Sequence, residues 1–248
     1  MKSYPNNYLQ INTKFRTNPN DNTNNCRIEL PDKLQKGNWR LVHFLFPNTS
    51  FTVNDNNNKI TIRESILSNQ PITCIIDKGF YTYDSLPYAI IDALNNSDGL
   101  KKKYGFTYSD LTRQITLTNL FIDFQIIFDN KLTSCSELLG FNEVNMAFAR
   151  NHTGQGIINL EPMHILNVSV DGISSINQKN LFASTFIIPI PSERFGYTNY
   201  VPEINFQQYM YVNSDKRSIS LKLTDELHRP VDLNRADYMF VLERLCDE

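Results

Sequence analysis

The sequence lacks long apolar runs and paired cysteines. No stretch approaches the roughly 18 consecutive apolar residues of a membrane-spanning helix, so we expect no transmembrane helix. The chain has four cysteines without a C-x-x-C pair or a Cys/His spacing typical of zinc, namely Cys26, Cys74, Cys135 and Cys246. Because no signal peptide is visible either, we expect free thiols in a soluble protein made in the cytosol.

A strongly basic surface is also missing. The formal net charge is −2, and Lys101–Lys103 is the one basic run. Proteins that bind nucleic acid directly usually carry a basic face or tail, because neutralised phosphates drive that binding. We therefore expect no direct nucleic-acid partner.

Motifs for catalysis and cofactor binding are absent from the sequence. It has no G-x-S-x-G, H-E-x-x-H or Walker lysine motif. Gly154-Gln155-Gly156 begins like a phosphate-binding loop, but Asn159 stands where a third glycine is needed, which favours a flexible loop. We expect a protein that is not an enzyme and has no catalytic or cofactor-binding residues.

Two sets of polar residues are the candidates for metal ligands. The histidines are dispersed, which favours packed or hydrogen-bonded imidazoles over a zinc site: His43, His152, His164 and His228. An acidic stretch near the C-terminus could hold calcium in a loop, although a solvated hairpin is the preferred interpretation: Asp225, Glu226, Asp232 and Asp237. We predict no bound metal or other cofactor.

The sequence is rich in aromatic and strand-favouring residues. Its 248 residues include 16 Phe and 12 Tyr. Such side chains fit a pleated, half-buried sheet, so the composition favours a mainly β protein. The length suits one large β-domain, or one domain that carries a smaller insertion.

The first 25 residues are polar, Asn-rich and punctuated by proline. Such a segment buries too little apolar area to offset the entropy of ordering it alone. We interpret residues 1–25 as an extended N-terminal arm, disordered or ordered only against a neighbouring subunit. Its one strand-like motif is Tyr8–Asn12, which alternates apolar and polar residues.

Strand patterns flank a central segment of different character. They lie at 26–30, 39–46, a hairpin at 51–63, and then at 163–170, 183–189, 204–212, 218–224 and 238–245. Three before and five after make the eight strands of a single jelly-roll sandwich, over 26–70 and 159–248. The segment 71–158 reads as an inserted α+β module, with a helix near 84–95 that begins at Asp84 and carries Pro87 in its first turn.

Aromatic residues crowd one short region of the second half. They are Phe195, Tyr197, Tyr200, Phe206, Tyr209 and Tyr211. Core packing accounts for most of them, and a subunit interface, where Tyr is enriched, is the alternative for the rest.

Short motifs follow one another along nearly the whole chain. They read INTKFR and CRIELP (11–16, 26–31), FPNTSFTV (46–53), DKGFYT (77–82), LLGF (138–141), and LTDE, RPVDLN and YMFVL (223–226, 229–234, 238–242). In their order and spacing they resemble motifs of the penton and minor capsid proteins of virophages and polinton-like viruses. Thr13 stands where that family usually has Ser.

The resemblance implies a structural role in a virion. A protein of this family forms a homopentamer at the fivefold vertices and contacts the double jelly-roll major capsid protein. It implies assembly in the cytoplasm of an infected host cell, with the insertion projecting outward, where it could meet a host receptor. The alternative is a jelly-roll spike or receptor- or glycan-binding minor capsid protein, because the same motifs occur in those proteins.

Overall fold

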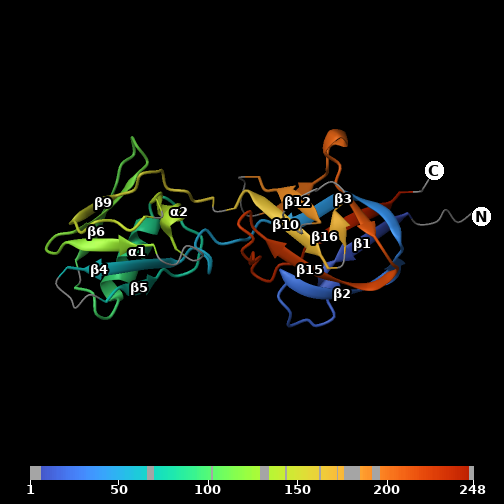
Figure 1. Ribbon diagram of the computed structural model, residues 1–248, viewed down its shortest axis with the longest axis horizontal. Coiled ribbons are helices and arrows are strands. Elements are labelled where there is room, and N and C mark those ends of the chain that lie inside the picture. Colours follow the sequence, from blue (N-terminus) through green and yellow to red (C-terminus); the bar gives the residue numbers. More distant parts are fainter. Residues whose placement is uncertain are drawn as a thin grey trace, which may run out of the picture. The chain divides into compact units, whose positions relative to one another are not determined.

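The computed structural model describes residues 7–65, 70–101, 103–128, 134–142, 144–161, 163–171, 173–175, 185–191 and 196–245. The chain divides into two compact units (Figure 1). Unit 1 comprises Met1–Ser50 and Met163–Glu248, and unit 2 is Phe51–Pro162. Predicted features at Cys246, Lys102 and Phe195 lie outside the described residues. Among the described residues no helix is both long and apolar enough to cross a membrane.

In unit 1 the residues that the structure describes form two antiparallel sheets. The first runs in the order β1 (Tyr8–Asn12), β16 (Met239–Arg244), β3 (Gly37–Pro47), β14 (Tyr209–Val212) and β11 (Ser174–Ser175), and β13 (Tyr197–Tyr200) also pairs with β3. The second runs in the order β12 (Phe186–Pro189), β10 (Ile165–Val170), β15 (Lys216–Thr224) and β2 (Asn25–Leu34). Short 3₁₀ helices lie at Thr13–Phe15 and Ile204–Phe206.

The strand order of unit 1 is that of a jelly roll. Taken along the chain, β1, β2, β3, β10, β12, β14, β15 and β16 divide into one sheet ordered β1-β16-β3-β14 and another ordered β2-β15-β10-β12. Eight strands divided four and four in this order are those of a jelly roll, and the short strands β11 and β13 extend the first sheet. The predicted fold class is confirmed.

The core of unit 1 lies between these sheets because their strands alternate buried and exposed residues. In β15 the buried apolar members are Ile219, Leu221 and Leu223. Phe44 in β3 is fully buried and stacks on Tyr238 and Phe240, with ring centroids 5.6 and 5.8 Å away. The alternation of apolar and polar residues that the sequence predicted therefore places one face of each sheet in the core between them.

The first strand of the jelly roll lies in the segment that we expected to be an arm. β1 pairs with β16 from Tyr8 opposite Glu243 to Asn12 opposite Met239. Leu9 and Ile11 are buried in the core, so this segment does cover apolar area, against its own chain. The prediction of an arm was wrong for β1, because a strand of only five residues contributes little to the polar composition of residues 1–25.

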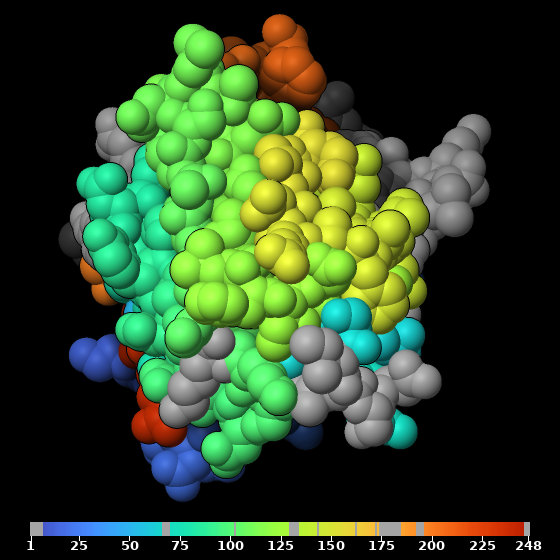
Figure 2. Space-filling view, turned by 90° about the vertical axis from the view of Figure 1, so that its left-hand side faces the viewer, coloured from blue at the N-terminus to red at the C-terminus, as the bar shows by residue number. Residues whose placement is uncertain are grey.

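The described residues of unit 2 form two three-stranded antiparallel sheets and two helices. One sheet is ordered β5 (Ile72–Ile75), β4 (Lys59–Glu64), β8 (Phe124–Ile127), and the other β6 (Tyr104–Tyr108), β7 (Ile115–Asn119), β9 (Asn151–Thr153). The helices are α1 (Leu86–Asn96) and α2 (Ser136–Leu139). In the space-filling view the segments around β6 and β7 (green) and β9 (yellow) form a continuous surface (Figure 2).

Helix α1 forms where the apolar spacing predicts it. Leu86, Ile90 and Leu94 lie on its buried face and join the core of unit 2. Its N-cap is Ser85, not Asp84 as predicted, and Ser85 donates its N–H to the Thr82 hydroxyl at 3.2 Å. Pro87 does lie in the first turn, where a missing N–H costs little.

The insertion is longer than the predicted 71–158. The hairpin expected at 51–63 does not form, because Val53 exchanges both backbone hydrogen bonds with Gly79, at 3.0 and 3.1 Å. Strand β4 then pairs with β5 and β8 inside unit 2. The chain consequently leaves the jelly roll after Ser50 and returns at Met163.

Candidate functional site

The residues considered for metal binding do not converge. His152 is buried, and its Nε2 lies 2.7 Å from the Phe124 carbonyl oxygen. His43 lies in β3, and His164 and His228 are exposed. Within the part of the chain that the structure describes, no three His, Cys, Asp or Glu side chains gather where they could hold a metal ion.

The acidic residues near the C-terminus contact different partners and do not form one cluster. Asp225 is buried and pairs with Arg229, with Oδ2 2.6 Å from Nε. Asp237 pairs with Arg16 at 2.7 Å, and Asp232 accepts from the Asn234 N–H at 2.8 Å. The preferred solvated hairpin is therefore wrong for Asp225, which holds its turn together from inside.

The cysteines described by the structure are poor nucleophiles. Burial raises the pKa of Cys26 to about 11 and that of Cys135 to about 12, and it also raises the pKa of Cys74. The thiolate is the reactive form of cysteine, so these thiols stay protonated at neutral pH.

The glycine pair at 154 and 156 packs tightly and is not the flexible loop that we predicted. Gly156 donates its N–H to the Gly140 carbonyl at 2.7 Å. A Cβ on Gly154 would come within 2.8 Å of the Leu139 carbonyl oxygen. Gly140, from the LLGF motif, ends α2 in the left-handed conformation at φ +70°. These glycines allow two backbone segments to approach each other.

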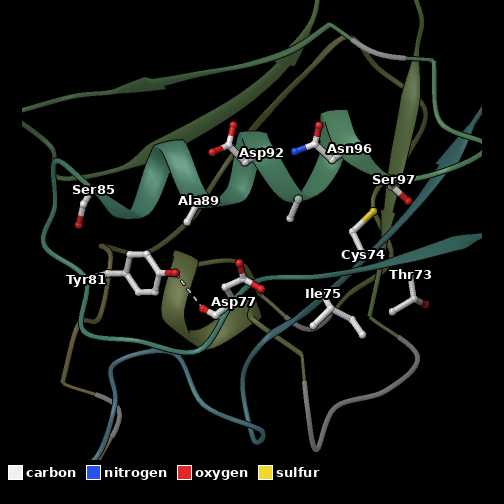
Figure 3. A pocket seen from close by; sticks show the side chains of 11 residues that line it. Thr73, Cys74, Ile75, Asp77, Tyr81, Ser85, Ala89, Asp92, Asn96 and Ser97 are labelled. Carbon is white, nitrogen blue, oxygen red and sulfur yellow. Dashed lines mark hydrogen bonds between the residues drawn. The ribbon is translucent and has the colours of Figure 1, made fainter.

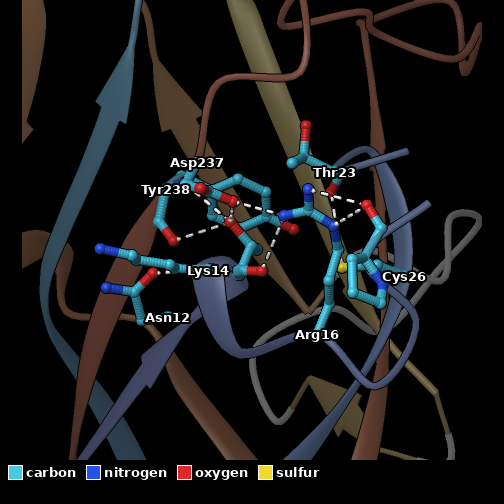
Figure 4. Close-up of polar contacts among 9 residues, drawn as sticks. Asn12, Lys14, Arg16, Thr23, Cys26, Asp237 and Tyr238 are labelled. Atoms are coloured by element: carbon cyan, nitrogen blue, oxygen red, sulfur yellow. Dashed lines mark hydrogen bonds and ion pairs between the residues drawn. The ribbon is translucent and has the colours of Figure 1, made fainter. Parts of the chain in front are cut away.

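The N-terminal INTKFR motif joins β1 to β16 (Figure 4). Asn12 accepts from the Lys14 N–H at 2.9 Å and so caps the first 3₁₀ helix. Buried Thr13 donates to Asp237 at 3.0 Å and accepts from the Tyr238 N–H at 2.9 Å. Arg16 bonds Asp237 and also the Thr13 carbonyl at 3.1 Å. The motif thus fixes the start of the jelly roll against its end.

Thr13→Val is expected to destabilise unit 1 by about 1–3 kcal/mol, because it leaves the buried Tyr238 N–H without its acceptor. Thr13→Ser keeps the hydroxyl and should restore most of that loss. Denaturant unfolding followed by the fluorescence of Trp39, the chain's one tryptophan, measures the change. Thr17→Val, at an exposed position, is the control. An unchanged midpoint for Thr13→Val would show that the bond contributes nothing.

The FPNT and RPVDLN motifs meet although they are far apart in sequence. Thr49 donates its hydroxyl to the Leu233 carbonyl at 2.7 Å, and Ser50 donates to the Asp232 carbonyl at 3.0 Å. Asn234 donates its amide to the Thr49 carbonyl. The residues of these two motifs, which contribute to the family resemblance, therefore make hydrogen bonds that hold the fold together.

A group of large apolar side chains lies exposed on unit 1, in β13 and in the loop that leads from it to β14. We call residues 197–206 the apolar segment; its exposed members are Tyr197, Val201, Ile204 and Phe206. Ile204 is 87% exposed and Phe206 70%. The first four residues of the segment form β13, and the rest is the orange loop that stands off the sheets in Figure 1. We expected a strand at 204–212, whereas the structure has a 3₁₀ helix and then β14, so the alternation there did not reveal this surface.

A buried carboxylate in unit 2 also proves to be structural. Glu64 accepts from the Tyr104 hydroxyl at 2.8 Å and from the Lys101 N–H at 3.0 Å. Burial, and then the bond to Glu64, raise the pKa of Tyr104, which therefore remains a donor. The pair ties the end of β4 to β6.

The chain aligns with solved structures of other proteins, two of which are given below. No family model matches the sequence, and no curated protein matches it. The crystal structure of the selenomethionine-labelled mavirus penton protein aligns with 12% identity and a TM-score of 0.43, over 96% of this chain and 99% of that chain. A 3.5 Å cryo-EM structure of the Sputnik virophage aligns with 11% identity and a TM-score of 0.37, over 96% of this chain and 97% of that chain.

Proposed function

We propose that the protein is a structural capsid protein that forms the pentameric vertex of an icosahedral virion. Support comes from the jelly-roll strand order of unit 1 together with the family motifs, whose residues make the contacts that define this fold. In this role the protein assembles with itself and with the major capsid protein, and it has no catalytic step to perform.

The apolar segment is the observation that carries the proposal. Isolated exposed apolar residues are common on soluble proteins, but several large ones close together can mark an interaction surface. Here four such residues lie within ten positions on the side of β3 where β13 and β14 pair. Aromatic residues are enriched at protein interfaces, which suits Tyr197 and Phe206 to a contact with the next subunit.

Native mass spectrometry tests the proposal. The protein should give a species of five copies, and Ile204→Asp should dissociate it, because a buried unpaired carboxylate is costly at an interface. Leu227→Asp is a matched control, since Leu227 is also exposed on unit 1 but outside the apolar segment. A wild-type protein that stays strictly monomeric or trimeric with the major capsid protein present would contradict the proposal.

One feature of unit 2 favours the second candidate, a receptor- or glycan-binding spike. Tyr83 stacks on Tyr108 with ring centroids 6.1 Å apart, and Arg113 lies 5.9 Å from the Tyr83 ring. Tyr83 is partly exposed, and a small aromatic platform of this kind can bind a sugar ring. A glycan array probed with the full chain and with Tyr83→Ala tests it. Wild-type binding that this change abolishes would favour the spike.

A further inference from the structure

The two edges of the β5-β4-β8 sheet in unit 2 differ. The outer edge of β8 is occupied: Phe124 and Ala149 exchange hydrogen bonds at 2.9 and 3.0 Å, and Met146 donates to the Ile126 carbonyl at 3.1 Å. β5 forms the other edge, and no second strand pairs with it among the described residues. The sheet therefore has one covered edge and one open edge.

The open edge presents unused backbone groups. Ile76 donates its N–H to the Asn58 carbonyl at 2.8 Å, and Cys74 lies opposite Ile60 in the same register. Along an antiparallel strand the backbone N–H and C=O groups of successive residues point to opposite sides. Those of Cys74 and Ile76 therefore point towards β4. The N–H and C=O groups of Thr73 and Ile75 consequently point away from β4, as an added strand would require.

A groove runs between this edge and helix α1 (Figure 3). Its volume is about 590 Å³. Thr73 and Ile75 line the strand side, and Ala89 and Ala93 line the helix side. Ala89 points from the helix towards the strand in Figure 3. Two alanines one helical turn apart leave room for the side chains of an incoming segment.

The groove is acidic. Asp77, just after β5, and Asp92, on α1, line it and are exposed, and none of its lining residues is Lys, Arg or His. The neighbouring Lys78 is paired with Asp55 at 3.1 Å. An occupant with a lysine or arginine side chain would complement these carboxylates.

We propose that β5 and α1 form a docking groove for an extended, lysine- or arginine-bearing peptide segment of a partner protein. The segment adds a strand to the sheet at β5. Its main-chain hydrogen bonds to Thr73 and Ile75 provide affinity, while the alanine wall and the two carboxylates provide selectivity. This inference is independent of the pentamer, because it concerns unit 2 alone.

Selection from a displayed library of random ten-residue peptides on the full-length protein tests the proposal. We expect selected peptides to be enriched in Lys or Arg, and the synthesised peptides to slow hydrogen exchange at the amides of Thr73 and Ile75. Failure to select any binding peptide, or binding without protection at these amides, would overturn it.

Paired variants locate the binding site. Ala93→Trp fills the groove and should lower the affinity of the selected peptides by roughly tenfold or more. Ala147→Trp, at an exposed position of unit 2 outside the groove, should leave their affinity unchanged. Asp92→Asn should weaken Lys-bearing peptides several-fold, and Asp98→Asn, which removes the same charge outside the groove, should leave their affinity unchanged. Equal affinities within either pair would overturn the proposal.

Two further measurements separate the alternatives. Ile75→Pro removes one outward N–H without removing a bond to β4, so it should weaken binding even if Ala93→Trp proves misfolded. Carbohydrate binding that depends on Ala93, with no peptide selected, would assign the groove to a glycan and contradict the proposal.

Discussion

Asp225→Ala is expected to destabilise unit 1 by about 3–5 kcal/mol, because it leaves the buried guanidinium of Arg229 without its counter-charge. The side chains of Asp225 and Arg229 are only 5% and 10% exposed. The same carboxylate accepts from the Leu227 and Arg229 N–H groups, at 2.9 and 2.8 Å, so the turn after β15 loses its internal acceptor as well. Few other single changes in unit 1 combine a buried charge with two lost backbone bonds.

Urea unfolding followed by Trp39 fluorescence measures this loss, since Trp39 is buried in unit 1. Asp32→Ala is the matched control, because it removes an exposed carboxylate from unit 1, and exposed substitutions usually change stability by less than about 0.5 kcal/mol. If both variants changed stability by less than 1 kcal/mol, the buried pair would not hold the turn.

Gly140→Ala is expected to have a comparable effect on unit 2. Alanine in the left-handed conformation costs about 1–2 kcal/mol. In addition, its Cβ would lie 2.6 Å from the Ile157 carbonyl oxygen and closer still to that of Gly156, and relieving such overlap costs a further 1–3 kcal/mol or so. Both backbone segments would have to move, because no flexible side chain can yield.

Hydrogen exchange of the β7 and α2 amides follows the stability of unit 2, and these amides should exchange faster in Gly140→Ala. Gly79→Ala is the control, since its Cβ would meet only ordinary contacts from 3.4 Å outwards. Equal exchange in the two variants would show that the close approach of Gly140 to Gly156 is not a constraint on the fold.

The jelly roll was predictable because it depends on period-two alternation, which a single sequence displays. Five predicted strands after the insertion correspond to β10, β12, β14, β15 and β16. The boundaries were less predictable. β1 is short and lies in a polar segment, and Val53 pairs with Gly79 across a loop that local composition could not reveal.

The candidate surfaces depend on tertiary contacts that leave little local signal. Ile204 and Phe206 alternate as strand residues do, yet the turn at Ile204–Phe206 exposes both. The groove requires β5 and α1 to lie side by side, whereas the sequence predicted the helix without indicating which strand lies beside it. Asp225 and Arg229 are four residues apart in a turn, and their burial follows from the packing of the turn, not from that spacing.

Electron microscopy of assembled particles that contain this chain is the most direct test of the proposed capsid role. We expect the chain to trace into density at the fivefold axes, with five jelly rolls in a closed ring and the apolar segment buried between neighbours. Density for the chain at another position, or particles whose vertices form without it, would contradict the proposed capsid role.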